Sequence, residues 1–136
     1  DGSEVMVSAK PINAATPRSV LAVVKPNGSL VADLTGVIDG GYWSNDGNSI
    51  AYFNDSAHQL VVWQPDSKAS RSIPLPAQPS PWYGCIWSPQ NTWLACSGGH
   101  AVVRGDPTTR LLVDPTTRRA GTVKTADIPV VWLSGS

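Results

Sequence analysis

The sequence is poor in charge and has no long apolar run. Only 15% of its 136 residues are charged, and 10 Lys and Arg balance 10 Asp and Glu. Such a chain has no long-range field to gather phosphates or anionic lipid heads, which argues against nucleic acid and membrane surfaces as partners. Its apolar runs reach about five residues, far short of the roughly 20 that cross a bilayer. We therefore expect no membrane insertion.

Familiar catalytic and metal-binding motifs are also missing. The sequence contains no G-x-S-x-G, H-E-x-x-H, Walker or G-x-G-x-x-G motif, which argues against a hydrolase or nucleotide site within these residues. His58 and His100 are its only histidines, and its two cysteines have no further metal ligands nearby. The aspartates fall mostly in turns, where Asp commonly binds its own backbone. We expect no enzyme activity, no cofactor and no metal.

Helical periodicity is absent, and strand signals dominate. No stretch of about 11 residues keeps a 3.6-residue period, and 12 Gly and 12 Pro divide the chain into short pieces. Four β-branched or aromatic runs end in turn residues, at 20–24, 50–53, 60–63 and 111–113. These features predict an all-β fold of many short strands.

An internal repeat organises these strands. Residues 43–53 align with residues 87–97 at an offset of 44, with Trp, Ser and Ala identical. Trp132 begins a further copy, and residues 1–8 match 46–53, so the chain opens in the second half of another copy. Between these hairpins, three apolar runs end in the proline turns Lys-Pro-Asn-Gly, Gln-Pro-Asp-Ser and Asp-Pro-Thr-Thr. Two hairpins per period give four antiparallel strands, the size of a propeller blade.

The first complete copy carries a family signature. From Trp43 it reads Trp-Ser-Asn-Asp-Gly-Asn-Ser-Ile-Ala-Tyr, which resembles the W-S-P-D-G-x-x-I-A-Y pattern of TolB-like, WD40-like (PD40) β-propeller repeats. Only the proline is missing, and Asn45 stands in its place. The copy at Trp87 keeps Pro89 but has Gln-Asn for Asp-Gly, and a longer connection follows it over residues 98–110. The resemblance covers nearly the whole chain and implies four-stranded antiparallel blades.

The repeat predicts a single β-propeller segment of about three blades. With the strands of a blade named a to d, we expect strands b-c-d over about 1–35, blades a-b-c-d over about 36–76 and 81–125, and a closing strand a over about 128–136. Propellers typically close with four to eight blades. The segment is therefore expected to be part of a longer propeller or to assemble from several copies, since open edges invite self-association.

The hairpin register pairs the two cysteines. If Ser88 and Trp93 flank a four-residue turn, Cys85 lies directly opposite Cys96. Opposed residues at a non-hydrogen-bonded site come close enough for a disulfide. A disulfide would indicate an exported protein, periplasmic, cell-surface or extracellular, whereas two reduced buried thiols would fit the cytoplasm.

The resemblance implies a loop face for ligands. In such propellers the d-a and b-c loops emerge near the central channel, and here these loops span 38–42, 78–83 and 98–110. The candidate binding residues in them are Asp39, Tyr42, Trp82, Tyr83, His100, Arg104 and Asp106. Trp82 and Tyr83, beside two prolines, would either form a stiff aromatic ledge for peptide or sugar contacts or cap the core.

These observations favour a non-catalytic protein-interaction or scaffolding module of an exported β-propeller protein, with a protein or peptide partner. One alternative is the propeller domain of a prolyl-oligopeptidase-like peptidase whose catalytic domain is absent from these residues. Another is a structural subunit of an extracellular assembly. A G-x-S-x-G segment followed by Asp and His in the complete reading frame would favour the peptidase.

Overall fold

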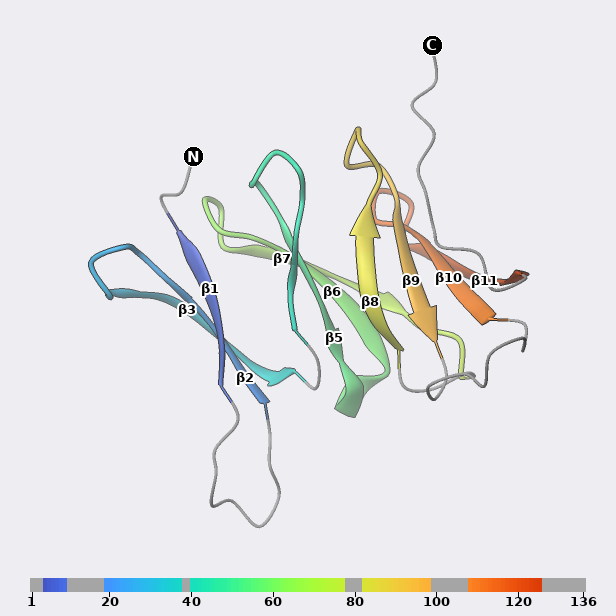
Figure 1. Ribbon diagram of the computed structural model, residues 1–136, viewed down its shortest axis with the longest axis horizontal. Helices are drawn as coiled ribbons and strands as arrows, with labels where there is room; N and C mark the ends of the chain where they lie inside the picture. The colour runs from blue at the N-terminus through green and yellow to red at the C-terminus, as the bar shows by residue number, and fades with distance from the viewer. Residues whose placement is uncertain (1–3, 10–18, 38–39, 78–81, 99–107, 126–136) are drawn as a thin grey trace.

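The computed structural model describes residues 4–9, 19–37, 40–77, 82–98 and 108–125, which form β-strands and one short 3₁₀ turn, η1 (Asp55–Ala57) (Figure 1). The strands form three antiparallel sheets, which confirms the all-β prediction. The first sheet contains β1 (Val5–Ala9), β2 (Ser19–Val24) and β3 (Leu30–Val37). The second contains β4 (Tyr42–Trp43), β5 (Ile50–Asn54), β6 (Gln59–Gln64) and β7 (Ala69–Pro74). The third contains β8 (Trp82–Trp87), β9 (Leu94–Gly98), β10 (Thr108–Asp114) and β11 (Arg119–Thr125).

The sheets stand side by side in chain order and are called here the first, second and third blade (Figure 1). A single bridge between Val37 and Asn54 joins the first blade to the second. The predicted closing strand at 128–136 lies outside the described residues. The exact blade boundaries proposed from the sequence therefore stay a prediction.

Proline turns close the β2–β3, β6–β7 and β10–β11 hairpins, as the sequence predicted. Each turn contains one residue with positive φ: Gly28 at 82°, Lys68 at 54° and Arg118 at 57°. Glycine takes this conformation without steric cost, whereas Lys68 and Arg118 adopt it as non-glycine residues. The shape of the turn is therefore kept where the sequence changes.

Strand alternation gives the second blade two buried faces. Successive side chains of a strand point to opposite sides of the sheet. One face packs on the first blade, in a cluster formed by Leu21, Val23, Leu34, Ile50, Tyr52, Val61 and Trp63. The other packs on the third blade, in a cluster formed by Ala51, Phe53, Leu60, Val62, Ile73, Trp82, Cys85, Trp87, Leu94, Cys96, Leu111 and Val113. The buried side chains therefore lie between blades.

Gly41 lies close to side chains of both the first and the second blade. A Cβ atom placed on it would come within 2.7 Å of Leu21 Cδ2 and 3.0 Å of Ile50 Cγ2, and it would also overlap Met6 Sδ. Real Cβ atoms essentially never come within 3.0 Å of another atom, so a Cβ at this position would force the ends of the Met6 and Leu21 side chains to move.

We predict that Gly41→Ala lowers the free energy of unfolding by about 1–3 kcal/mol, because the added methyl group overpacks the junction. Urea denaturation followed by tryptophan fluorescence measures the change. Gly40→Ala is the matched control, since nothing lies within 4 Å of a Cβ at that position. Equal effects of the two substitutions would show that the close packing at Gly41 is unimportant.

Candidate functional site

Three of the predicted binding residues belong to the described part of the chain, and they lie near the junction of the second and third blades. Tyr42 is on β4, and Trp82 and Tyr83 open β8. The other four candidates, Asp39, His100, Arg104 and Asp106, lie outside the described residues. Their role, and that of the Tyr83 side chain, stays a prediction.

Trp82 is buried rather than displayed. Only 7% of its surface is exposed, and it belongs to the apolar cluster between the second and third blades. Of the two roles that the sequence left open, this burial favours capping of the core over an exposed aromatic ledge. Large aromatic side chains contribute much of their stabilising effect through such burial.

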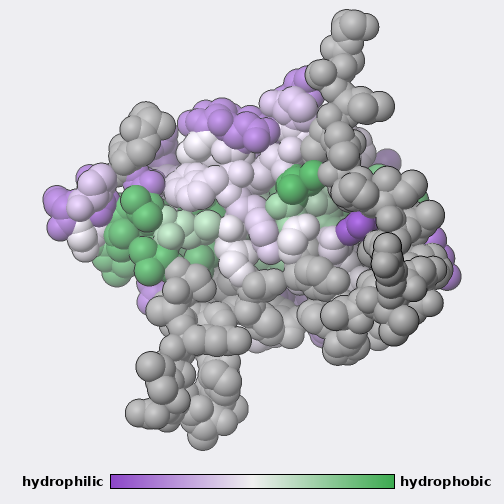
Figure 2. Space-filling view, viewed as in Figure 1, coloured by the Kyte–Doolittle hydropathy of each residue, from purple (hydrophilic) through white to green (hydrophobic). Residues whose placement is uncertain are grey.

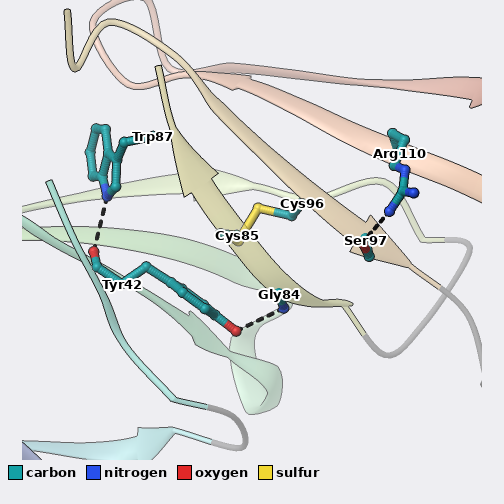
Figure 3. The surroundings of a disulfide bond; sticks show 7 residues. All are labelled: Tyr42, Gly84, Cys85, Trp87, Cys96, Ser97 and Arg110. Atoms are coloured by element: carbon teal, nitrogen blue, oxygen red, sulfur yellow. Dashed lines mark hydrogen bonds between the residues drawn. A yellow bond between two sulfur atoms is a disulfide. The ribbon is translucent and has the colours of Figure 1, made fainter. Parts of the chain in front are cut away.

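Tyr42 is held at both ends by the third blade (Figure 3). Its backbone carbonyl accepts a hydrogen bond from Trp87 Nε1 at 2.9 Å, and its hydroxyl oxygen accepts one from the Gly84 N–H at 2.8 Å. Gly84 lies in a register shift between Tyr83 and Cys85 and has a φ of 55°. A β-bulge of this kind re-aims backbone groups, and here the Gly84 N–H is directed at the neighbouring blade. Periodicity alone did not indicate the bulge.

Equivalent serines shape the β4–β5 and β8–β9 turns. Ser44 Oγ accepts a hydrogen bond from the Ser49 N–H at 2.9 Å, and Ser88 Oγ accepts one from the Trp93 N–H at 3.0 Å. Both serines are buried. The Trp-Ser pair of the repeat thus has a direct structural role, in which the tryptophan packs between blades and the serine satisfies the turn backbone.

Two departures from the repeat signature bind each other. Asn45 stands where the signature has proline, and Asn91 stands where it has the turn glycine. The Asn45 N–H donates to Asn91 Oδ1 at 2.8 Å, and Asn45 Nδ2 donates to the Ser88 carbonyl at 2.8 Å and to Asn91 Oδ1 at 3.0 Å. Proline at 45 would lack the N–H donor. Asn91 keeps the positive φ of the glycine it replaces, 56° against 73° at Gly47.

Asp46 and Asp114 have lowered pKa values because they accept hydrogen bonds within their own turns. The Ser44 hydroxyl, at 2.5 Å, and the Asn48 N–H both donate to Asp46 and lower the pKa of its carboxyl below the usual 3.8. The hydroxyl and N–H of Thr117 lower the pKa of Asp114 in the same way. Hydrogen bonds to the charged form favour ionisation. These contacts confirm, for both residues, the prediction that turn aspartates bind their own turns.

The disulfide predicted from the hairpin register is present. Cys85 and Cys96 are directly paired across β8 and β9, with an S–S distance of 2.06 Å and a Cα–Cα distance of 4.1 Å. Both residues are buried in the cluster between the second and third blades. The bond thus links the first two strands of the third blade inside the surface that the second blade covers (Figure 3).

Reduction, or the double substitution of Cys85 and Cys96 by Ala, is predicted to lower the free energy of unfolding by about 2–4 kcal/mol, because the closed loop no longer restricts the unfolded chain. Denaturation with and without dithiothreitol measures this loss. The double alanine variant should be insensitive to the reductant. Two alkylatable thiols in freshly purified, unreduced protein would contradict the disulfide.

Asn45 and Asn91 are predicted to be energetically coupled. In a double-mutant cycle with Asn45→Ala and Asn91→Gly, we expect a coupling of about 0.5–1.5 kcal/mol. Either substitution alone already removes the amide–amide contact, so the double variant does not lose it a second time. Gln90→Ala, an exposed change in the same turn, is the control and should show no coupling to Asn45→Ala. Additive effects of the two asparagine changes would argue that their contact is unimportant.

Within the described residues, no three His, Cys, Asp or Glu residues are placed to hold a metal ion. Likewise, none of the described secondary structure is a helix long and apolar enough to span a membrane.

Comparison with known proteins identifies the fold. No protein-family model and no curated protein matches the chain. Among solved structures, the orthorhombic crystal form of Pyrococcus horikoshii acylaminoacyl peptidase matches with a TM-score of 0.66 and 12% identity, over 91% of this chain and 23% of that one. The β-propeller domain of the Trilobed protease from Pyrococcus furiosus, which has an open velcro topology, matches with a TM-score of 0.62 and 14% identity, over 91% and 40%. The chain has a β-propeller fold.

The chain spans less than half the length of either neighbour. Identities of 12% and 14% establish shared architecture alone. The propeller predicted from the repeats is therefore confirmed at the level of the fold, with three blades that do not close into a ring within the described residues.

Proposed function

We propose that the chain is a non-catalytic interaction or scaffolding module of an exported, TolB-like β-propeller protein. The strongest support comes from the structural roles of the polar residues in the repeat. Ser44 and Ser88 hold turns, and Asn45 and Asn91 join neighbouring blades. These groups serve to position blades rather than to converge on a reacting atom.

The blades offer a rigid base for the proposed loop face. Tyr42 is held by two hydrogen bonds to the third blade, and Trp82 is buried between blades. The loop segments at 38–41 and 78–81 immediately precede these anchored residues in the sequence. Binding residues are commonly carried on loops held by such a scaffold. The proposed partner is a protein or peptide that contacts Asp39, His100, Arg104 and Asp106.

The disulfide supports export. Disulfides persist in oxidising compartments and are rare in the cytosol. The Cys85–Cys96 bond is buried between two blades, where it adds to the stability of the folded module. We therefore propose that the protein acts in the periplasm, at the cell surface or outside the cell.

A second candidate is the propeller domain of a peptidase. Both solved neighbours named above are peptidases or proteases. Fold likeness does not carry function across unrelated sites, so the decision depends on the rest of the gene. A complete reading frame with a G-x-S-x-G segment followed by Asp and His would favour this candidate over the scaffold.

We expect the oxidised chain to enrich peptides from a phage-displayed random library without cleaving chromogenic peptide or ester substrates. His100→Ala and Arg104→Ala should each weaken binding of an enriched peptide about fivefold or more, since a contact residue contributes about 1 kcal/mol. Isothermal titration calorimetry measures the affinity.

Lys68→Ala is the matched control. Lys68 lies in the β6–β7 turn, at the opposite end of the second blade from the β5–β6 connection. That connection is the b-c loop, which corresponds to the 98–110 loop of the third blade. Lys68→Ala should leave peptide affinity unchanged. Cleavage of the substrates by the purified chain would overturn the non-catalytic role. Peptide binding that neither loop variant affects would overturn the proposed loop face.

A further inference from the structure

The inner strand of the third blade changes register at one residue. In β8, Tyr83 pairs with Ser97 of β9. The next pair is Cys85 with Cys96, so Gly84 is an extra residue and forms a β-bulge. Its φ of 55° lies in the left-handed region, which glycine adopts more readily than any other residue.

The bulge determines that Trp82 faces the second blade. Successive residues of a regular strand point to opposite sides of the sheet, so residues 82 and 85 of a regular strand would point to opposite sides. Trp82 and Cys85 nevertheless belong to the same buried cluster between the second and third blades. The extra residue at Gly84 explains this, because it returns Trp82 to the side on which Cys85 lies.

Removal of the bulge would exchange two neighbouring residues. In the present register, Trp82 lies opposite Gly98. If the regular pairing continued past Cys85 and Cys96, Tyr83 would lie opposite Gly98 instead, and Trp82 would move to the other side of the sheet. A one-residue slip has this effect in any β-strand. Both positions hold an aromatic residue, so the two registers would bury similar apolar area and local contacts select between them.

Two local features favour the bulged register. Gly84 adopts its positive φ without steric cost, and nothing lies within 4 Å of the place that a Cβ would occupy there. The Gly84 N–H also donates to the Tyr42 hydroxyl oxygen of the second blade at 2.8 Å (Figure 3). This hydrogen bond between blades holds the bulge in place.

The remainder of β8 is fixed in one register. The Cys85–Cys96 disulfide joins β8 to β9 at the first pair after the bulge. Beyond it, the β8–β9 turn is bound to the β4–β5 turn through Asn91 and Asn45, and Figure 2 shows hydrophilic residues at the tips of these two turns. A change of register is therefore confined to the residues that precede Cys85, and it leaves the disulfide intact.

We propose that Gly84 and the Tyr42 hydroxyl form a conformational latch that determines which residue of β8 is buried against the second blade. With the latch closed, Trp82 is buried. With the latch open, β8 takes the regular register and Trp82 turns to the opposite side of the sheet. Since Trp82 is the first residue of β8, the latch also sets the orientation in which the chain enters the third blade. It acts within the fold and does not require the loop face to bind a partner.

Fluorine NMR of the oxidised chain labelled with 5-fluorotryptophan tests the latch. A soluble gadolinium chelate speeds the relaxation of exposed indoles more than that of buried ones. Trp87 and Trp93, which are 7% and 43% exposed, supply the buried and exposed references on the same blade. Single substitutions by Phe assign the three signals. In the wild-type chain, we expect the chelate to affect Trp82 as little as Trp87.

Two substitutions at Gly84 form the decisive pair. Gly84→Val should raise the effect of the chelate on Trp82 about fivefold or more, to near that on Trp93, because a β-branched residue disfavours positive φ and favours an extended strand. Gly84→Asn should leave the effect within about twofold of the wild-type value, since asparagine tolerates positive φ. A Cβ at this position meets no other atom, so the two variants differ in backbone preference rather than in packing.

Tyr42→Phe tests the other half of the latch. This change removes the hydroxyl acceptor of the Gly84 N–H but keeps the Tyr42 backbone carbonyl, which binds Trp87 Nε1. We expect the effect of the chelate on Trp82 to rise about twofold or more, since the bulge loses one hydrogen bond. The effect on Trp87 should stay unchanged.

Circular dichroism checks that each variant folds, and the absence of alkylatable thiols checks that Cys85 and Cys96 stay bonded, as both registers require. A Trp82 that stays as protected as Trp87 in folded Gly84→Val would overturn the proposal. Exposure of Trp82 and Trp87 together would also overturn it, because the whole junction would then have opened. Equal exposure of Trp82 in the Asn and Val variants would do so as well. None of these measurements uses a peptide, so the loop-face function is judged separately by its own binding experiment.

Discussion

The structure depends on the packing of one blade face on the next. A strand that alternates apolar side chains on both sides of a thin sheet has no core of its own. In the second blade, Ile50 faces one neighbour and Leu60 the other, and both are fully buried. Apolar burial stabilises in proportion to the area removed from water. The stability of each blade is therefore shared with its neighbours, as in other repeat proteins.

Polar contacts at the rim set how the apolar faces meet. Apolar packing is not directional, so two sheets could slide over each other with little loss of buried area. Tyr42 is bound to Trp87 and Gly84 on the third blade, and Asn45 is bound to Asn91. These hydrogen bonds require one register and one angle. The junction therefore combines burial, which provides most of the free energy, with a few directional contacts that select the arrangement.

Local signals in the sequence were sufficient to predict the strands, the proline turns and the Cys85–Cys96 pairing. Turn residues and two-residue alternation act within a hairpin, so a single repeat encodes them. The bulge at Gly84, the burial of Trp82 and the contact between Asn45 and Asn91 could not be predicted in this way. Each depends on which side chain the neighbouring blade presents. Comparing the departures from the signature in adjacent repeats would have indicated the asparagine pair.

Departures from the repeat differ between the junction of the second and third blades and the opposite side of the third blade. Asn45 and Asn91 replace signature residues at an interior junction, where each finds its partner in the other. Arg110 and Ser97 stand where the second blade has Leu60 and Phe53, on the side of the third blade that faces away from the second. Burying a guanidinium against an apolar sheet carries a desolvation cost, so this side of the third blade differs from the corresponding side of the second, where Leu60 is fully buried. The two sides of the third blade therefore differ in polarity.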